Sequence, residues 1–248
     1  MLSIIIPVRN ESDSLEGIME HYSKNLTNFE YEVLIINDFS EDDTLEKARN
    51  LFRNDNFKVF DNEKKGLGGA INLGIKKAVG SNVAIMMADR SDDIDDLIKY
   101  NSLINTDNHD AILGSRFLKE SNVLNYPIQK LVLNRIFNYF VGLVFWNNYN
   151  DYTNAFKIYK KKTLDEISPL ISESFNIFLE IPLKIISRKY KYKIIPINWT
   201  GRTKGVSKFK IKELRSKYLF TLIYCFIEKN LLKINKLNLF LIYLYKNQ

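Results

Sequence analysis

The sequence predicts an α/β fold, in which a mostly parallel sheet is flanked by helices and followed by an amphipathic helical tail. Short apolar segments rich in β-branched residues alternate with helix-like segments over residues 1–115, a pattern typical of strand-helix-strand units. Several of the apolar segments end in Asp or Asn, which is where open α/β sheets build ligand sites. A chain of 248 residues with 46% hydrophobic content can bury a substantial core.

The first half contains five predicted strands, each a short apolar run between turn residues. They cover residues 2–8, 31–36, 57–60, 83–87 and 111–114. Helices are expected over residues 13–24, 42–52, 66–78 and 92–103. Ser and Asp side chains accept hydrogen bonds from the free amides of a helix start. We therefore expect Asp13 or Ser14 to cap the first helix, and Asp42 and Asp92 to start the second and fourth.

The pattern changes after Tyr126-Pro127, and the second half is predicted to be an elaboration of the same fold. The expected elements are a helix over 128–144, a strand over 155–159, a helix over 175–188 and a strand over 192–199. The tail contains two apolar runs, 218–227 and 237–245. Neither run reaches the roughly 20 residues that a membrane-spanning helix needs. We expect one domain over 1–210, with halves 1–115 and 116–210, and a separate tail over 211–248.

The positive charge of the chain lies in the tail. The net charge is +7, yet residues 201–248 hold eleven Lys or Arg against two acids, so the first 200 residues carry about −2. Basic residues between Phe, Leu, Ile and Tyr favour contact with an anionic membrane surface. The simpler alternative is a solvated Lys-rich helix, and nucleic acid is disfavoured because no recognition motif accompanies the charge.

Cysteine, histidine and the first residues narrow the class of protein further. The single cysteine, Cys225, excludes an intramolecular disulfide and is expected to be buried. The two histidines do not belong to a zinc-spacing motif. No cleavable apolar region precedes Arg9. We expect a cytoplasmic protein that lies peripherally on the inner face of the cell membrane.

Three polar clusters follow predicted strands and are expected to meet at one edge of the sheet. They are Pro7 to Glu11, Asn37-Asp38, and Asp89. Asp89 ends the run Ile85-Met86-Met87-Ala88 and could hold a hard cation against a phosphate. The glycines of 66–69 resemble a phosphate loop only weakly, because they lack both the dinucleotide fingerprint and the Lys-Ser/Thr of a P-loop.

Six ordered motifs over residues 2–210 resemble those of family 2 inverting glycosyltransferases with the GT-A fold. The similarity is strongest to the branch of dolichol-phosphate mannose and other polyprenyl-phosphate glycosyl synthases. The motifs are Pro7-Val8-Arg9-Asn10-Glu11, Ile36-Asn37-Asp38-Phe39-Ser40-Glu41-Asp42-Asp43-Thr44, Gly66-Leu67-Gly68-Gly69-Ala70, Gly114-Ser115-Arg116-Phe117, Asp151-Tyr152-Thr153-Asn154-Ala155-Phe156-Lys157 and Arg202-Thr203-Lys204-Gly205-Val206-Ser207-Lys208. The Asp-Ala-Asp of the branch reads Met87-Ala88-Asp89 here, and its Asp-Asp after the second strand reads Asn37-Asp38.

The resemblance implies a nucleoside-diphosphate sugar as donor, bound by the half that covers residues 1–115. The residues that would bind it are Pro7, Arg9, Glu11, Asn37, Asp38, Gly66, Gly68, Ala88 and Asp89. Asp89 would also hold Mg²⁺ or Mn²⁺ on the diphosphate, where a cation offsets the charge of the leaving group. Asp89 is thereby the metal ligand that we expect.

The resemblance also implies a polyprenyl phosphate acceptor, bound by the half that covers residues 116–210. Arg116, Arg135 and Arg202 would contact the phosphate, since guanidinium groups form paired hydrogen bonds with it. With Asp89 they form the expected catalytic set. Asp151, Thr153 and Lys208 complete the expected acceptor site. A phosphate is already anionic near neutral pH and needs little help from a general base.

Two alternatives stay open from the sequence. The first is a transferase that acts on a glycan hydroxyl of a cell-envelope saccharide, with Asp151, Asp92 or Glu180 as general base. The second is a non-catalytic nucleotide-sugar-binding scaffold at a membrane, which the substitution at Met87 favours. The sequence leaves the oligomeric state open, a homo-oligomer included.

Overall fold

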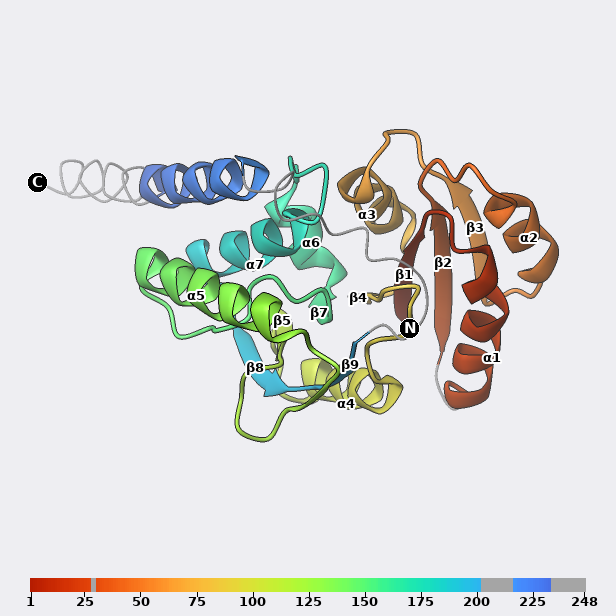
Figure 1. The fold of residues 1–248 in the computed structure, drawn as a ribbon, viewed down its shortest axis with the longest axis horizontal. Helices are drawn as coiled ribbons and strands as arrows, with labels where there is room; N and C mark the ends of the chain where they lie inside the picture. Colours follow the sequence, from red (N-terminus) through yellow and green to blue (C-terminus); the bar gives the residue numbers. More distant parts are fainter. Residues whose placement is uncertain (28–29, 202–215, 233–248) are drawn as a thin grey trace, which may run out of the picture.

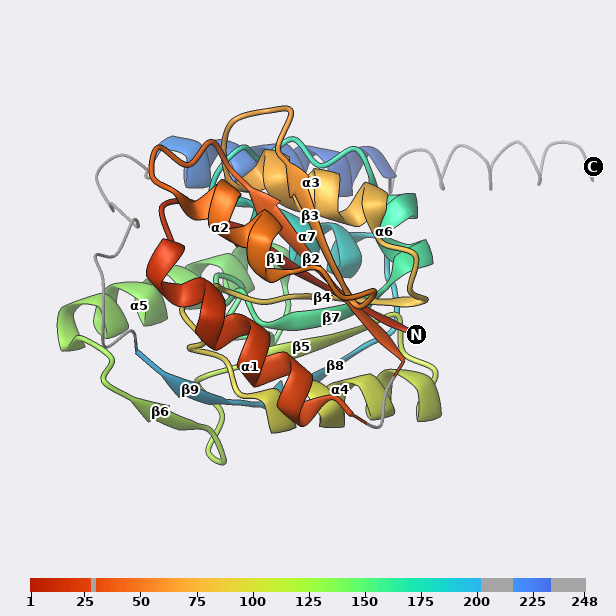
Figure 2. The same cartoon turned by 90° about the vertical axis from the view of Figure 1, so that its right-hand side faces the viewer.

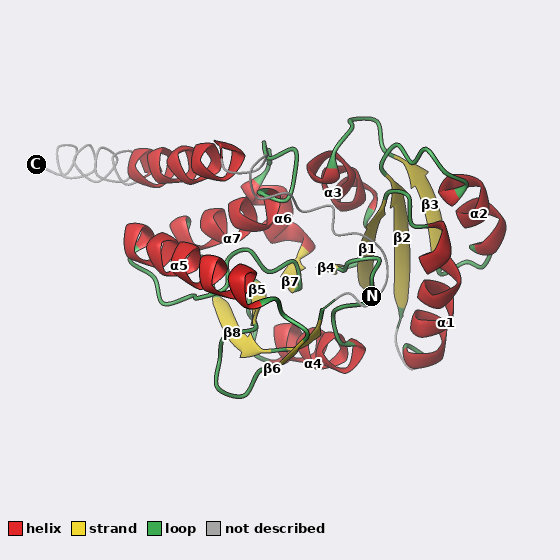
Figure 3. Cartoon of the chain, in the orientation of Figure 1, coloured by secondary structure: helices red, strands yellow, loops and turns green. Residues whose placement is uncertain are grey.

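The computed structural model describes residues 1–27, 30–201 and 216–232, and its centre is a seven-stranded sheet (Figures 1 and 3). The strand order is β3-β2-β1-β4-β7-β5-β8. All neighbours pair in parallel except β7, which is antiparallel to both β4 and β5. The strands are β1 (Leu2–Val8), β2 (Tyr31–Asn37), β3 (Phe57–Asp61), β4 (Asn82–Ile85), β5 (Ala111–Ser115), β7 (Lys157–Lys160) and β8 (Tyr192–Pro196). The predicted mostly parallel sheet is confirmed.

Helices cover both faces of the sheet (Figures 1 and 2). They are α1 (Leu15–Asn25), α2 (Thr44–Leu51), α3 (Leu67–Lys77), α4 (Ile94–Thr106), α5 (Ile128–Phe145), α6 (Lys161–Ile167) and α7 (Ile177–Ser187), and a 3-10 turn η1 (Ser12–Ser14) precedes α1. Side chains alternate between the faces of a strand. Ile4 and Ile6 of β1 pack in the core with α1, α2 and α4, whereas Ile5 packs in the core with α3, α6 and α7. Burial on both faces explains why the central strands are mostly apolar.

Part of the predicted tail belongs to the main core. Residues 216–232 form a helix beside α5 (Figure 1), and its Tyr218, Leu222 and Cys225 are buried in the same core cluster as α7. Lys229 donates from Nζ to the carbonyl oxygen of Phe145 at 2.7 Å. The second apolar run of the tail, 237–245, lies outside the described residues. Within the described ranges we find no helix that is long and apolar enough to cross a membrane.

Several element boundaries differ from the sequence-based expectation. The single strand expected over 192–199 is divided into β8 and β9 (Asn198–Thr200), and β9 pairs in parallel with β6 (Asn122–Leu124) in a separate two-stranded sheet. The short helix α6 was not predicted. Ser14 occupies the N-cap position of α1 without a side-chain capping bond, because its hydroxyl donates to Glu11 Oε2. At α2 the N-cap is Asp43 and not the predicted Asp42, although Asp42 accepts from the Thr44 amide at 3.0 Å.

Candidate active site

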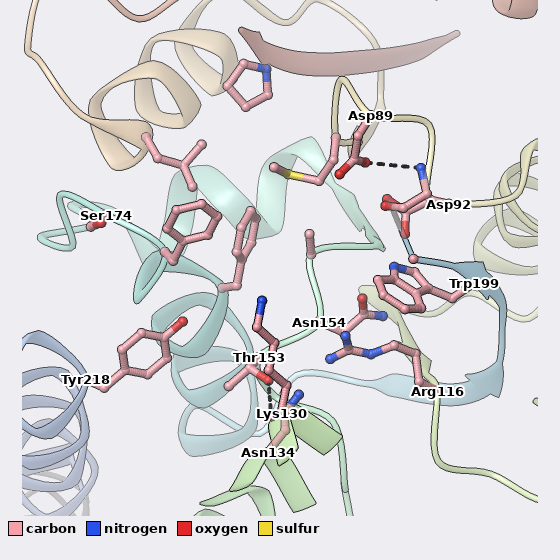
Figure 4. A pocket seen from close by; sticks show the side chains of 18 of the residues that line it. Asp89, Asp92, Arg116, Lys130, Asn134, Thr153, Asn154, Ser174, Trp199 and Tyr218 are labelled. Carbon is pink, nitrogen blue, oxygen red and sulfur yellow. Dashed lines mark hydrogen bonds between the residues drawn. The ribbon is translucent and has the colours of Figure 1, made fainter. Parts of the chain in front are cut away.

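A cavity of about 840 Å³ opens at the carboxyl edge of the parallel strands. Its polar end is formed by residues that follow β1, β2 and β4, and its apolar end by α5, α7 and the helix over 216–232. Figure 4 shows Asp89, Asp92, Trp199 and Arg116 on one side of the cavity and Ser174 and Tyr218 on the other. The expected convergence of sequence-distant polar clusters at this edge is found in the structure.

Most of the expected donor residues line the polar end: Pro7, Arg9, Glu11, Asp38, Gly66 and Asp89. Asp38 is buried, and its Oδ1 accepts hydrogen bonds from the Gly66 amide at 2.7 Å and from Asn62 Nδ2 at 2.8 Å. These bonds attach the loop before α3 to the end of β2. Asp38 therefore shapes the glycine loop while it also faces the cavity.

The two glycines of this loop have different physical roles. Gly66 has φ of +118°, a backbone conformation that side chains rarely adopt. Gly68 has ordinary backbone angles, but a Cβ there would overlap the carbonyl oxygen of Ser172. The Gly68 amide donates to the Glu173 carbonyl at 3.1 Å. Gly66 lines the cavity, and Gly68 brings α3 against the segment that forms the opposite wall.

Three expected donor residues, Gly68, Asn37 and Ala88, do not line the cavity. Asn37 is buried and donates from Nδ2 to Asp61 Oδ1 of β3 at 2.9 Å. Ala88 is buried in the core on the face covered by α1 and α4. Met87, which stands where the resemblance would place an acid, does line the cavity. In the segment after β4, Met87 and Asp89 therefore line the cavity, whereas Ala88 between them is buried in the core.

Asp92 was predicted to cap a helix, and the structure shows that this prediction was wrong. The N-cap of α4 is Asp93, whose carboxylate accepts from the amides of Asp95 and Asp96. Asp92 instead lines the cavity, is 4% exposed, and neither carboxylate oxygen has a hydrogen-bond partner among the described residues. Two acids in succession made both plausible caps, and sequence alone does not tell which one the chain turns inward.

The surroundings of Asp92 disfavour its charged form. Burial raises its pKa from 3.8 to about 7, and the neighbouring charge of Asp89 acts in the same direction, whereas the charge of Arg116 partly opposes this. Asp89 Oδ1 accepts from the Ser91 amide at 3.1 Å. The polar end of the cavity therefore carries two acids within one short loop.

The expected acceptor residues Arg116 and Asp151 form a buried ion pair. Asp151 accepts from Arg116 Nε at 2.8 Å, from its Nη2 at 2.7 Å and from its backbone amide at 2.9 Å. The Asp151 charge raises the pKa of Arg116 although burial acts against it. Lys157, which is fully buried, donates to the carbonyl oxygens of Tyr152 and Asn154, and burial lowers its pKa to about 7.

The remaining expected acceptor residues are spread over neighbouring positions. Arg135 of α5 lies with its guanidinium 4.9 Å from the ring centroid of Phe117 and lines a smaller adjacent pocket that Arg116 also lines. Thr153 lines the main cavity and donates to Asn134 Oδ1 at 2.7 Å. Arg202 and Lys208 lie outside the described residues.

Sequence reasoning missed several lining residues. Lys130 contributes a cation from the first turn of α5, and Trp199 of β9 contributes an aromatic ring. The apolar end is lined by Leu133, Phe137, Phe140, Phe175, Phe178, Tyr218, Leu219 and Leu222. Helical periodicity in α5 and α7 indicates that they have apolar faces, but it does not say that two such faces leave a cavity between them.

A mostly parallel α/β sheet with a cavity at the carboxyl edge of its strands is the arrangement in which α/β enzymes bind their ligands. The chain belongs to glycosyl transferase family 2, whose family model matches residues 3–168. It is therefore a glycosyltransferase, as the sequence motifs predicted.

Two curated relatives belong to the polyprenyl-phosphate branch. The dolichol-phosphate mannosyltransferase of Pyrococcus furiosus is 29% identical over 219 residues, which are 86% of this chain and 60% of the relative. The polyprenol monophosphomannose synthase of Mycolicibacterium smegmatis is 26% identical over 223 residues, 86% of this chain and 82% of the relative. This chain thus spans about three fifths of the length of the first relative.

Solved structures confirm the GT-A fold. Glucosyl-3-phosphoglycerate synthase of Mycobacterium tuberculosis, crystallised with Mn²⁺, UDP and glucosyl-3-phosphoglycerate, superimposes with a TM-score of 0.70 at 13% identity over 91% of this chain and 79% of that chain. A crystal of the same enzyme with Mg²⁺ and UDP gives a TM-score of 0.69 at 14% identity, with the same coverage of both chains.

Proposed function

We propose that this glycosyltransferase transfers a hexose from a nucleoside-diphosphate sugar to a polyprenyl phosphate, with inversion at the anomeric carbon and with the help of Mg²⁺ or Mn²⁺. One observation carries the proposal: a single cavity joins an acidic end at the strand edge to an apolar end between three helices. A charged donor and a lipid acceptor need opposite environments within reach of each other. This cavity offers both.

The polar end fits the donor. Pro7, Arg9, Glu11 and Asp38 line the part next to β1 and β2, where carboxylates can accept from the N–H groups of a base and the hydroxyls of a ribose. The Gly66 loop at the start of α3 supplies backbone close to this position. The proposed donor site lies in the half that covers residues 1–115.

The metal would be held by Asp89. The described residues contain no group of three or more His, Cys, Asp or Glu side chains that could hold a metal ion. A single carboxylate such as Asp89 fits Mg²⁺ or Mn²⁺ bound to a nucleotide, because Mg²⁺ takes one or two carboxylates and completes its shell with phosphates and waters. When bound, such an ion offsets the charge that develops on the leaving diphosphate.

The apolar end fits the lipid acceptor. Phe137 and Phe140 of α5, Phe175 and Phe178 beside and within α7, and Leu222 of the helix over 216–232 face this end. Aromatic and aliphatic walls favour hydrocarbon by removing its surface from water. An isoprenoid chain placed there would leave its phosphate near the middle of the cavity.

Lys130 is the best placed cation for that phosphate among the described residues. It lines the cavity from the first turn of α5. Arg116 also lines the cavity, but Asp151 already accepts two hydrogen bonds from its guanidinium. We therefore assign the acceptor phosphate to Lys130, with Arg116 as a second, partly neutralised contact that Asp151 orients.

The arrangement of acids supports a phosphate acceptor over a glycan hydroxyl. Of the three residues considered as general base, Asp151 is paired with Arg116, and Glu180 accepts from the amides of Ile171 and Ser172 beside Lys184. Of these three acids, Asp92 is the one whose carboxylate oxygens have no hydrogen-bond partner among the described residues. A hydroxyl acceptor with Asp92 as its base is the alternative function that this observation keeps.

Two parallel helices would hold the protein on a membrane surface. Exposed apolar side chains on α5 include Ile128, Val132, Ile136, Tyr139 and Leu143, and those on the neighbouring helix are Leu219, Phe220, Ile223, Phe226, Ile227 and Leu231. The helices contact each other through Phe137 with Tyr218 and Phe145 with Phe226. We call these exposed residues the apolar face. It adjoins the apolar end of the cavity, so a lipid could enter from a bilayer on the cytoplasmic side.

Transfer assays with a defined lipid acceptor test the proposal. Purified protein would be screened for stabilisation by UDP- and GDP-linked hexoses with Mn²⁺ or Mg²⁺, because a ligand that binds the folded state raises the unfolding temperature. The stabilising donor would then be incubated with a short polyprenyl phosphate, the corresponding polyprenol and a saccharide. We expect glycolipid only with the phosphate. Transfer to the saccharide alone would establish the alternative.

A further inference from the structure

Asp92 is a buried acid at the wall of the cavity, and the described part of the chain offers it no hydrogen-bond partner. It is 4% exposed, both carboxylate oxygens lack a hydrogen-bond partner among the described residues, and the side chain borders the cavity. Burying a carboxylate without hydrogen bonds costs several kcal/mol in proteins. A ligand with hydroxyl groups would satisfy these oxygens.

Backbone contacts fix Asp92 beside an aromatic ring. Asp92 forms an antiparallel bridge with Trp199 of β9, and the Thr200 amide donates to the Ser91 carbonyl at 3.0 Å. The Asn198 amide donates to Asp96 Oδ2 at 2.7 Å, which attaches β9 to α4. Asp92 and Trp199 therefore keep a fixed relative position, and Figure 4 shows them on the same side of the cavity.

The Trp199 ring is part of a small aromatic and cationic cluster. The Tyr126 ring centroid lies 5.1 Å from that of Trp199, and the Arg116 guanidinium carbon lies 5.5 Å from it. An acid beside an aromatic ring suits a pyranose, which offers hydroxyl donors at its edge and C–H groups on its face. Asp92 lies three residues after Asp89, so a sugar bound there would be next to the proposed diphosphate position.

Resting on the proposed function, we infer that Asp92 and Trp199 form the subsite for the hexose of the donor. Asp92 accepts hydrogen bonds from one or two ring hydroxyls, and Trp199 packs against the ring. The subsite selects donors whose sugar has hydroxyl donors facing Asp92. It acts on the sugar and leaves the nucleotide and the diphosphate to the residues that follow β1, β2 and β4.

Binding measurements with the free nucleotide and its sugar conjugate separate this role from the others. Wild type, Asp92→Asn, Asp92→Ala and Asp95→Asn would be titrated with UDP, UDP-glucose, GDP and GDP-mannose in the presence of Mn²⁺. Asp95 is an exposed acid on the first turn of α4 and gives a control with the same change in charge. We expect Asp92→Ala to weaken binding of the nucleotide sugar at least tenfold, while binding of the free nucleotide changes less than twofold.

Other outcomes would overturn the inference. An equal loss for nucleotide and nucleotide sugar would place Asp92 on the metal or diphosphate. Unchanged binding of both, together with a large loss of turnover in Asp92→Asn, would make Asp92 a general base. If the wild-type protein binds none of the four ligands, the proposed function fails as well, which a failure of Asp92 alone would not produce.

Sugars that lack single hydroxyls give a sharper test. For the donor that binds, one deoxy analogue should lose affinity for the wild type by about as much as Asp92→Ala loses for the intact donor. The same analogue should show little further loss with Asp92→Ala, because the two changes remove one interaction. Trp199→Leu should weaken the binding of all analogues by a similar factor. Additive losses for every analogue would contradict a contact between Asp92 and the sugar.

Discussion

At the scale of single residues, the acids of the cavity differ in what stabilises their charge. Asp38 accepts from two N–H donors, and Asp151 accepts from the Arg116 side chain and backbone. Asp92 has neither kind of partner among the described residues. These differences set which acid can bind a ligand without first losing a protein contact.

Asp89 is the residue on which metal use depends. Replacing it with Asn keeps the size of the side chain but removes the charge that would hold the cation. Since metal binding provides several kcal/mol of stabilisation for the developing charge, we expect a loss of roughly 100-fold or more in kcat/KM, as about 1.4 kcal/mol corresponds to tenfold. Initial rates over a Mn²⁺ titration would measure this. Asp95→Asn is the control, and full activity of Asp89→Asn would refute the assignment.

The pH dependence of stability should reveal the buried carboxyl of Asp92. Its pKa is 3.8 when unfolded and about 7 when folded, so the folded protein binds more protons between these values. The contribution of Asp92 to the free energy of unfolding is therefore at its maximum below about pH 4 and decreases as the pH rises to 7. At about 1.4 kcal/mol per pH unit, the loss reaches up to about 4 kcal/mol.

Asp92→Asn removes this dependence. Thermal unfolding of both proteins from pH 4 to pH 8 should show little difference at pH 4 and a more stable variant at pH 7. Asp95→Asn should not reproduce the trend. Parallel curves for wild type and Asp92→Asn would mean that Asp92 is paired in solution.

Removing the acid of the Arg116 and Asp151 pair should destabilise the protein, in contrast to Asp92→Asn at pH 7. Asp151→Asn leaves a buried guanidinium without its counter-charge, which costs about 3–5 kcal/mol in other proteins. Urea unfolding should show a loss of this size. The control is Asp165→Asn, because Asp165 forms an exposed pair with Lys161 and such pairs contribute about 1 kcal/mol or less. Equal effects of the two substitutions would contradict the buried pair.

At the scale of elements, sequence patterns predicted strands and helices better than their ends. β1 and β2 are buried throughout and mostly apolar because both faces are covered, and this signal is local. The antiparallel insertion of β7 between β4 and β5 depends on long-range pairing, which periodicity does not contain. The convergence of Asp38 and Asp89 was predictable because parallel strands end at one edge. The inward turn of Asp92 was not, since Asp93 offers the same chemistry one residue later.

The start of α3 supplies a prediction about elements. Gly68→Ala would place a methyl group against the Ser172 carbonyl oxygen and push α3 away from the wall of the cavity. Overpacking of this kind costs about 1–3 kcal/mol, and the Gly66 loop should shift with the helix. We expect a lower unfolding temperature and weaker nucleotide binding. Lys76→Ala, at an exposed position of the same helix, should change neither, and an unchanged Gly68→Ala protein would contradict the close contact.

At the scale of the whole molecule, the donor and acceptor sites share one cavity but are built by different parts of the chain. The donor end depends on loops after β1, β2 and β4, whereas the acceptor end depends on α5, α7 and residues 216–232. Tyr218 and Leu222 line the cavity and belong to the core. Residues from 211 onward were expected to form a separate tail. Because 216–232 completes the cavity wall, we propose that this helix is part of the catalytic domain.

The apolar face yields the prediction that involves the whole molecule. Ile136, Tyr139 and Leu143 form an exposed stripe on α5, and Tyr139 is 77% exposed. Replacing all three with Glu removes apolar area that a bilayer would cover, and each Å² no longer buried weakens binding by about 25 cal/mol. The substitutions also add negative charges that anionic lipids repel. We expect at least a tenfold loss of binding to vesicles that contain anionic lipid, measured by co-sedimentation.

Transfer to a short, soluble polyprenyl phosphate should be affected far less, because these three side chains do not line the cavity. Val79→Glu is the control, since Val79 is 66% exposed but lies outside the apolar face. Unchanged vesicle binding of the triple variant would show that these three side chains of α5 do not contact the membrane. A matching loss of vesicle binding and of activity on the long-chain acceptor alone would show that lipid reaches the cavity across this face.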